Sequence, residues 1–195
     1  MRRSLFAIVM LLALAGAVRA EEEAKPTVPV VPQPTQPTPI SPSPMESHLT
    51  SQIYVGEPAP DFELDGSEGR PVRLAHLKGY WVLLVFADRR TDLKALAEIE
   101  PDLRHLGVRP YGVCADKAHV LRAHAEREGL PVVMLSDVTG EISQVYGLYD
   151  TRMRLVRPGF ALIDRYGVVR MALLGQKIPF DEILSLVTSA VTGTS

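Results

Sequence analysis

The residues with the clearest chemical potential are a single thiol and a short polar stretch that follows an apolar run. Cys114 is the only cysteine among the 195 residues, so no disulfide can form within the chain. The run from Tyr80 to Ala87 is typical of a buried strand, and it leads through polar residues into a helical pattern that carries Thr91 and Lys94. A helix start offers free amides and partial positive charge. We therefore expect any reactive or binding site to lie at this strand-to-helix junction.

Lys94 and Thr91 can each be interpreted with or without a function. Lys94, beside a helix start, can help to bind an anion, or it can be a solvated lysine that pairs with Asp88 or Asp92. Thr91 can simply cap the helix, and Asp92 then complements the helix dipole.

Cys114 also has two interpretations. It follows an apolar strand pattern, and cysteine is often buried as a small hydrophobic residue. A reactive thiolate needs an exposed and electropositive setting, which nearby Asp116 opposes. The sequence favours a buried, inert thiol and leaves open a redox role or an intermolecular disulfide.

The sequence shows no pattern typical of a metal, nucleotide or nucleic-acid site. The five histidines form no set of converging ligands, since His119 and His124 lie five residues apart, so no metal site is predicted. There is no phosphate-binding glycine loop, and we expect no cofactor. The formal net charge is −2, or −5 without Arg2, Arg3 and Arg19, which argues against a nucleic-acid binder.

The first 51 residues predict export and a tether. Residues 1–20 have a basic start, an apolar core and a small-x-small end at Val18-Arg19-Ala20, as in a cleaved secretory signal. The apolar core is too short to span a bilayer comfortably, so no stable membrane span is expected after cleavage, with an uncleaved anchor as the alternative. We expect a periplasmic or extracellular protein. Residues 21–51 form a proline-rich disordered linker that holds eight of the sixteen prolines, either as a passive spacer or as a ligand for a partner that recognises proline.

Residues 52–195 predict one folded domain. Apolar and turn patterns predict strands at 61–64, 71–74, 80–87, 108–114, 132–135, 159–163 and 168–173. Helical patterns follow the third of these strands, with a break or kink at Pro101, and also cover residues 117–128, which Asp116 can cap, the region around 142–146, and a last helix near Phe180. The alternation predicts an α/β sandwich, a central mixed sheet flanked by helices.

The order of several short motifs resembles the peroxiredoxin family. The segment Val55-Gly56-Glu57-Pro58-Ala59-Pro60-Asp61-Phe62 is similar to the opening of alkyl hydroperoxide reductase and thiol-specific antioxidant proteins. The strand ending at Phe86, then Gly112-Val113-Cys114-Ala115-Asp116, Leu135-Ser136-Asp137 and Phe160-Ala161-Leu162-Ile163-Asp164 follow in the family's order. The bacterioferritin-comigratory type is the most similar subgroup. The resemblance implies a thioredoxin-like fold over residues 52–191.

The resemblance also implies where the family's chemistry would lie. Peroxiredoxins use a Pro-x-x-x-Thr-x-x-Cys motif and an arginine, and these positions correspond to Ala87, Thr91, Lys94 and Arg157 in this chain. The resemblance implies that Arg157 lies near Lys94, either as a relic that local carboxylates orient or as an anion ligand. The peroxidatic cysteine is thus expected to be replaced by Lys94, and an ammonium group cannot replace a thiolate attacking a peroxide.

We therefore expect an exported peroxiredoxin-like domain with a degenerate active site, which acts as a binding or structural module for an unidentified protein partner. Two alternatives remain at this point. One is a thiol-dependent antioxidant oxidoreductase that acts through Cys114, and the other is a small-anion binding protein that uses Arg157 and Lys94.

Overall fold

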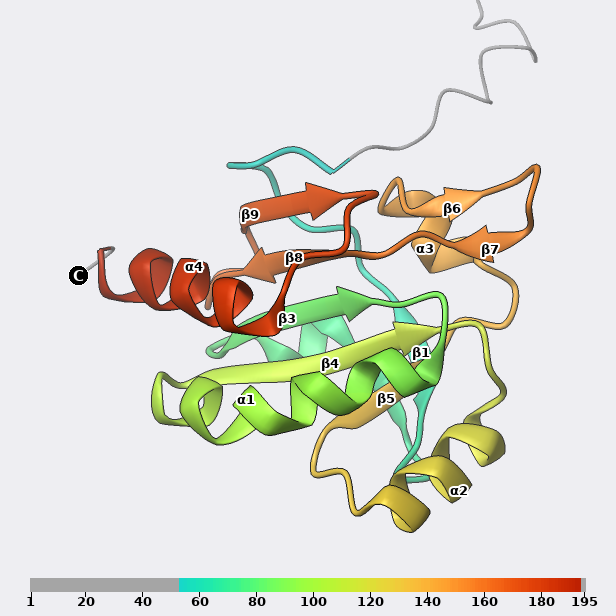
Figure 1. Ribbon diagram of the computed structural model, residues 1–195. Helices are drawn as coiled ribbons and strands as arrows, with labels where there is room; N and C mark the ends of the chain where they lie inside the picture. Colours follow the sequence, from blue (N-terminus) through green and yellow to red (C-terminus); the bar gives the residue numbers. More distant parts are fainter. Residues whose placement is uncertain (1–52, 194–195) are drawn as a thin grey trace, which may run out of the picture. The chain divides into compact units, whose positions relative to one another are not determined.

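The computed structural model describes residues 53–193. The predictions for residues 1–20 and 21–51 therefore lie outside the described residues. In the described part, seven strands form one sheet in the order β2-β1-β5-β4-β3-β8-β9 (Figure 1). These strands are β1 (Glu63–Gly66), β2 (Pro71–Arg73), β3 (Trp81–Phe86), β4 (Val108–Cys114), β5 (Val133–Ser136), β8 (Gly159–Ile163) and β9 (Val169–Leu174).

The sheet is mixed, as the sequence predicts. Strands β3, β4 and β5 are parallel, with Trp81 opposite Val108 and Tyr111 opposite Val133. Strands β8 and β9 form an antiparallel hairpin beside β3, and β1 joins β5 and β2 in antiparallel pairs. The parallel strands need crossover connections, and helices supply them.

Those crossovers are α1 (Lys94–His105) and α2 (Ala118–Glu128), and α4 (Phe180–Thr192) ends the described chain. The short α3 (Glu141–Val145) and the 3-10 turns η2 (Leu74–Leu77) and η3 (Arg90–Leu93) lie in the connections. A two-stranded ribbon of β6 (Tyr149–Asp150) and β7 (Leu155–Val156) is additional to the sequence prediction.

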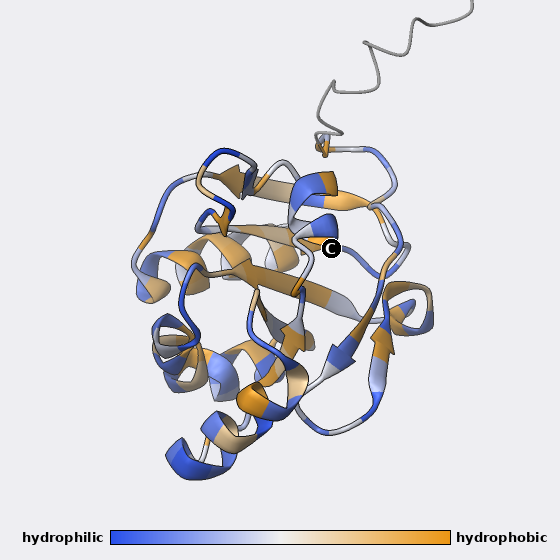
Figure 2. Cartoon of the chain, turned by 90° about the vertical axis from the view of Figure 1, so that its right-hand side faces the viewer, coloured by the Kyte–Doolittle hydropathy of each residue, from blue (hydrophilic) through white to orange (hydrophobic). Residues whose placement is uncertain are grey.

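Strand β3 lies inside the sheet between β4 and β8, and all six of its residues are buried. Val82, Leu84 and Phe86 point to one face of the sheet, where η2 and the residues after α3 cover them. Trp81, Leu83 and Val85 point to the other face, which α1, α2 and α4 cover. Figure 2 shows apolar residues concentrated along the central strands and hydrophilic residues in the connecting loops. The continuous apolar run therefore reflects burial on both faces.

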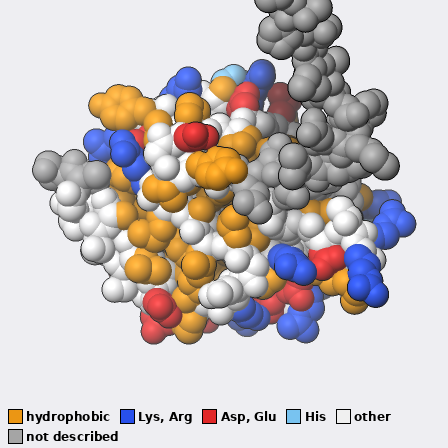
Figure 3. Space-filling view, turned by 90° about the horizontal axis from the view of Figure 1, so that it is seen from above, with side chains coloured by type: hydrophobic (Ala, Val, Ile, Leu, Met, Phe, Trp, Pro, Cys, Tyr) orange, Lys and Arg blue, Asp and Glu red, His pale blue; other side chains and the backbone are white. Residues whose placement is uncertain are grey.

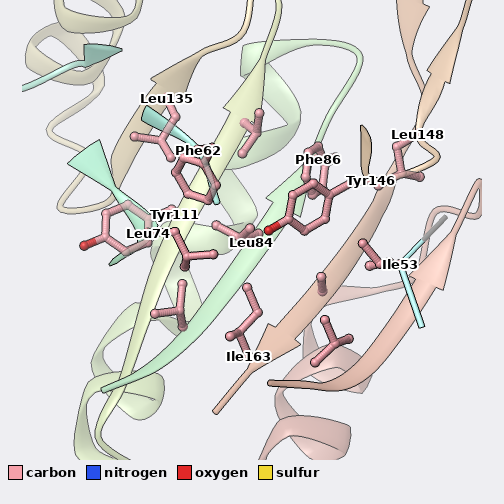
Figure 4. Packing of buried hydrophobic residues seen from close by; sticks show 14 of the residues in the cluster. Ile53, Phe62, Leu74, Leu84, Phe86, Tyr111, Leu135, Tyr146, Leu148 and Ile163 are labelled. Atoms are coloured by element: carbon pink, nitrogen blue, oxygen red, sulfur yellow. The ribbon is translucent and has the colours of Figure 1, made fainter. Parts of the chain in front are cut away.

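The core on the first face includes two aromatic rings in contact. The ring centroids of Phe86 and Tyr146 lie 5.4 Å apart, and the Tyr146 hydroxyl donates a hydrogen bond to the Pro60 carbonyl at 2.9 Å. Figure 4 shows these rings among the aliphatic side chains of the cluster. This bond ties the segment before β1 to the region that follows α3, far along the chain.

The predicted break of α1 at Pro101 and the predicted caps of α1 and α2 are wrong. Helix α1 runs without a break through Pro101, because Leu96 and Leu103 are fully buried on either side of the proline. Burying two leucines stabilises the helix by about 1.5–3 kcal/mol each, which offsets the roughly 3 kcal/mol cost of an interior proline. Thr91 does not cap α1 and Asp116 does not cap α2; the cap positions are Leu93 and Lys117, and neither donates or accepts a side-chain capping bond among the described residues.

Strand β9 forms one edge of the sheet. The segment before β1 covers only its start, where the Gly56 amide donates to the Val169 carbonyl at 2.8 Å and the Val169 amide donates to the Glu57 carbonyl at 2.9 Å. Figure 3, seen from the side on which β9 lies in Figure 1, shows apolar side chains spread over this face between charged ones. Tyr54 and Tyr166 are exposed large apolar residues in the described part of the chain.

Candidate functional site

The junction between β3 and α1 is built around one buried leucine. Leu93 ends η3, is 1% exposed and packs against β4 at Gly112. A β-carbon at Gly112 would lie 2.5 Å from Leu93 Cδ1, so only glycine leaves room for this contact. Thr91 lies within η3 (Arg90–Leu93), one turn before α1 rather than at its cap.

Lys94 is the first residue of α1, and its side chain is exposed. Its Nζ atom lies 3.5 Å from Glu128 Oε2 at the end of α2. The predicted pairing with Asp88 or Asp92 is wrong, because the end of α2 supplies a carboxylate within reach of Lys94 and Asp92 binds another lysine. The ammonium group of Lys94 is thus held on the protein surface between two helices.

Asp92 forms an ion pair with Lys177, a residue between β9 and α4. The Lys177 Nζ atom lies 3.0 Å from Asp92 Oδ2, and Arg89 lies 3.6 Å from the other carboxylate oxygen. Burial alone would raise the pKa of Asp92, but the bond from Lys177 and the nearby charges outweigh it and lower this pKa. Arg90 is also paired, with Asp116 at 2.9 Å. The cations at the start of α1 are therefore largely neutralised by carboxylates.

The structure brings two of the predicted site residues together and leaves the third apart. Thr91 and Lys94 line one open recess with Lys177 and Phe180. Arg157 is absent from that lining within the described residues. Its guanidinium instead lies 2.8 Å from Asp150 Oδ2, and its amide donates to the Leu148 carbonyl. The hydrogen bond from the Met153 amide and the ion pair with Arg157 lower the pKa of Asp150, so that carboxylate stays charged.

Cys114 lies at the end of β4 with no exposed surface, within the apolar cluster under α1 and α2. Burial raises the pKa of its thiol to about 12, and the charge of Asp116 acts in the same direction. The thiolate is the nucleophilic form, so the buried thiol is almost wholly unreactive at neutral pH. This observation weighs against the alternative in which Cys114 carries the chemistry.

Within residues 53–193, no three histidine, cysteine, aspartate or glutamate side chains come together as metal ligands would. The same part of the chain contains no helix with the length and apolar content needed to cross a bilayer.

Comparison with known protein families matches residues 55–172 to the AhpC/TSA family. This range includes Thr91, Lys94, Cys114 and Arg157. The chain is 33% identical over 134 residues to the selenocysteine-containing peroxiredoxin PrxU of Peptoclostridium acidaminophilum, covering 60% of this chain and 66% of the relative. It is 27% identical over 155 residues to chloroplastic peroxiredoxin Q of Sedum lineare, covering 74% of this chain and 83% of the relative. The chain thus spans just under two thirds of the length of PrxU.

Solved structures show the same fold at low identity. Peroxidoxin BcpB from Mycobacterium tuberculosis superposes with a TM-score of 0.65 at 19% identity, covering 74% of this chain and 99% of that one. The C47S mutant of Xylella fastidiosa PrxQ gives a TM-score of 0.63 at 15% identity, covering 71% and 98% of the two chains. The expected thioredoxin-like, peroxiredoxin-type sandwich is confirmed.

Proposed function

Because the chain belongs to the AhpC/TSA family, we propose that it keeps the peroxiredoxin fold but acts as a binding module that does not reduce peroxides. The observation that carries this proposal is the residue at the first position of α1. There the side chain is Lys94, paired with Glu128, and the only thiol of the chain is buried elsewhere. The family's reaction begins with a thiolate that attacks the peroxide O–O bond, and neither residue supplies one.

The surroundings of Lys94 support the same proposal. Activation of a thiol at a helix start depends on positive charge that lowers its pKa. In this chain Arg90, Lys94 and Lys177 each have a carboxylate partner within 3.5 Å. A pocket with balanced charges neither activates a nucleophile nor attracts an anion strongly, so we place the small-anion binding function behind that of a protein-binding module.

Peroxide consumption tests the proposal. Full-length protein is mixed with hydrogen peroxide or an organic hydroperoxide and dithiothreitol, with an active peroxiredoxin measured in parallel. We expect consumption at the rate of the buffer alone. A rate that approaches the active control would overturn the proposal, and the Cys114→Ser variant would then show whether that thiol is responsible.

We further propose that the protein is exported to the periplasm or the extracellular space. The basic, apolar and small-residue pattern of residues 1–20 supports this. Expression of the full gene followed by mass analysis of the protein should give a chain that starts at Glu21. A protein that keeps Met1 and stays in the cytoplasm would contradict the proposal.

A further inference from the structure

A second recess lies at the opposite end of α1 from Lys94. It forms where the parallel strands begin, since Tyr80 directly precedes β3 and Val108 opens β4 (Figure 1). Its volume is about 490 Å³, within the range of roughly 300–1,000 Å³ that is common for ligand sites. We call it the tyrosine groove, and its lining residues are Glu68, Tyr80, Glu100, Arg104, Gly107, Val108, Arg109, Pro110, Tyr111, Pro131 and Val133.

Two tyrosines and an arginine shape the tyrosine groove. The Arg109 guanidinium carbon lies 3.3 Å from the centroid of the Tyr80 ring, and Tyr80 is 44% exposed. The Tyr111 ring is nearly buried and packs in the core, and Figure 4 shows its hydroxyl directed away from the other labelled side chains. Packing in the core fixes the Tyr111 ring, and stacking on Arg109 orients the exposed Tyr80 ring, so both side chains are positioned before any ligand binds.

The rest of the tyrosine groove is rigid or charged. Pro110 and Pro131 add surfaces with few rotamers, so little entropy is lost when they contact a ligand. Arg104 donates to the buried carboxylate of Glu100 through Nε at 2.8 Å and keeps most of its side chain exposed. The groove thus combines apolar rings with guanidinium and hydroxyl groups that can donate hydrogen bonds.

We propose that the tyrosine groove binds an extended, proline-rich peptide. Such a peptide forms a polyproline II helix with three residues per turn, so prolines spaced by three lie along one ridge. Its carbonyls have no internal partners and accept bonds from outside. Grooves lined by aromatic rings take these ridges, and hydroxyl or guanidinium donors bind the carbonyls. The exposed Tyr80 ring provides the aromatic surface, and the Tyr111 hydroxyl and the Arg109 guanidinium provide the donors.

The chain itself contains a peptide of this chemistry. In residues 26–44, prolines are spaced by three at Pro26, Pro29 and Pro32, again at Pro34 and Pro37, and again at Pro39 and Pro42. A synthetic peptide of residues 26–44 is therefore the natural probe. Because the tyrosine groove includes neither Lys94 nor Cys114, this proposal can fail or succeed independently of the peroxide assay.

The test titrates this peptide into isotopically labelled full-length protein and follows the backbone amide signals by NMR. Pro32, Pro34, Pro37 and Pro39 of the protein are first replaced by serine, so that its own proline-rich segment does not compete. We expect saturable shifts at Tyr80, Arg109 and Tyr111. Tyr80→Ala should weaken binding by about tenfold or more, whereas Tyr166→Ala, at another exposed tyrosine, should leave it unchanged.

Two results would overturn the proposal. One is the absence of shifts at millimolar peptide. The other is an equal response to a peptide in which every proline is serine, since binding would then not depend on the polyproline ridge. The spectrum of each unbound variant shows whether it is folded. A loss of binding in Tyr80→Ala supports the proposal when that variant gives the spectrum of a folded protein.

Discussion

At the scale of single residues, the two side chains with nucleophilic or basic potential differ in accessibility. Lys94 is exposed and Cys114 is fully buried. Replacing Lys94 by cysteine should create a thiol that reacts with a thiol reagent in the native protein. In the wild type, Cys114 should react only after denaturation, because burial raises its pKa to about 12. Thiol titration of both proteins with and without denaturant checks this, and rapid native labelling of the wild type would contradict it.

A second prediction at this scale concerns Asp164, a buried carboxylate in the turn between β8 and β9. Burial alone would raise its pKa, but the bonds from the Val168 amide, Arg170 and the Tyr166 amide outweigh it and lower this pKa below 3.8. A lowered pKa in the folded state adds stability above the unfolded-state pKa, and this is lost as the pH falls through the folded-state pKa. Asp164→Asn should therefore unfold more easily at pH 7 and lose less stability between pH 7 and about 3 than the wild type.

Denaturant unfolding at several pH values measures this difference. Arg73→Gln, at an exposed ion pair with Asp61, is a suitable control because exposed pairs contribute little. If Asp164→Asn and the wild type lose stability in parallel on acidification, the account of Asp164 is wrong.

At the scale of elements, the contact between η3 and β4 positions the start of α1. Gly112→Ala should destabilise the protein by about 1–3 kcal/mol, because its methyl group would collide with Leu93. Combining it with Leu93→Ala removes the collision. The double variant should therefore lose less free energy of unfolding than the two single variants lose in sum. Denaturant unfolding measures both effects, and strictly additive changes would argue against the collision.

The elements also show what the sequence can predict. Local sequence patterns predict the buried strand β3, the hairpin of β8 and β9 and the apolar face of α4. These patterns are informative because each element buries a defined face. The continuity of α1 through Pro101 does not follow from them, because it depends on leucines packing against a sheet that the local pattern does not contain. The caps of α1 and α2 also depend on contacts between elements: Leu93 at the start of α1 packs against Gly112, and Asp116 before α2 pairs with Arg90.

At the scale of the whole molecule, family and fold could be predicted from the sequence because ordered motifs are spread over the domain. The site was only partly predictable. Thr91 and Lys94 do line one recess, but the partners of Lys94 and Arg157 are carboxylates that lie 34 residues later and 7 residues earlier in the chain. The tyrosine groove escaped prediction because Tyr80 and Arg109 belong to different strand starts that only the parallel pairing brings together.

The fate of the single thiol under peroxide tests the central claim most directly. The full-length protein is exposed to a small excess of hydrogen peroxide without a reductant, quenched, denatured, and its free thiol counted. We predict one reduced thiol per chain, equal to the unexposed sample, because Cys114 is buried and Lys94 cannot react. Loss of the thiol as fast as in an active peroxiredoxin treated alongside would contradict the account.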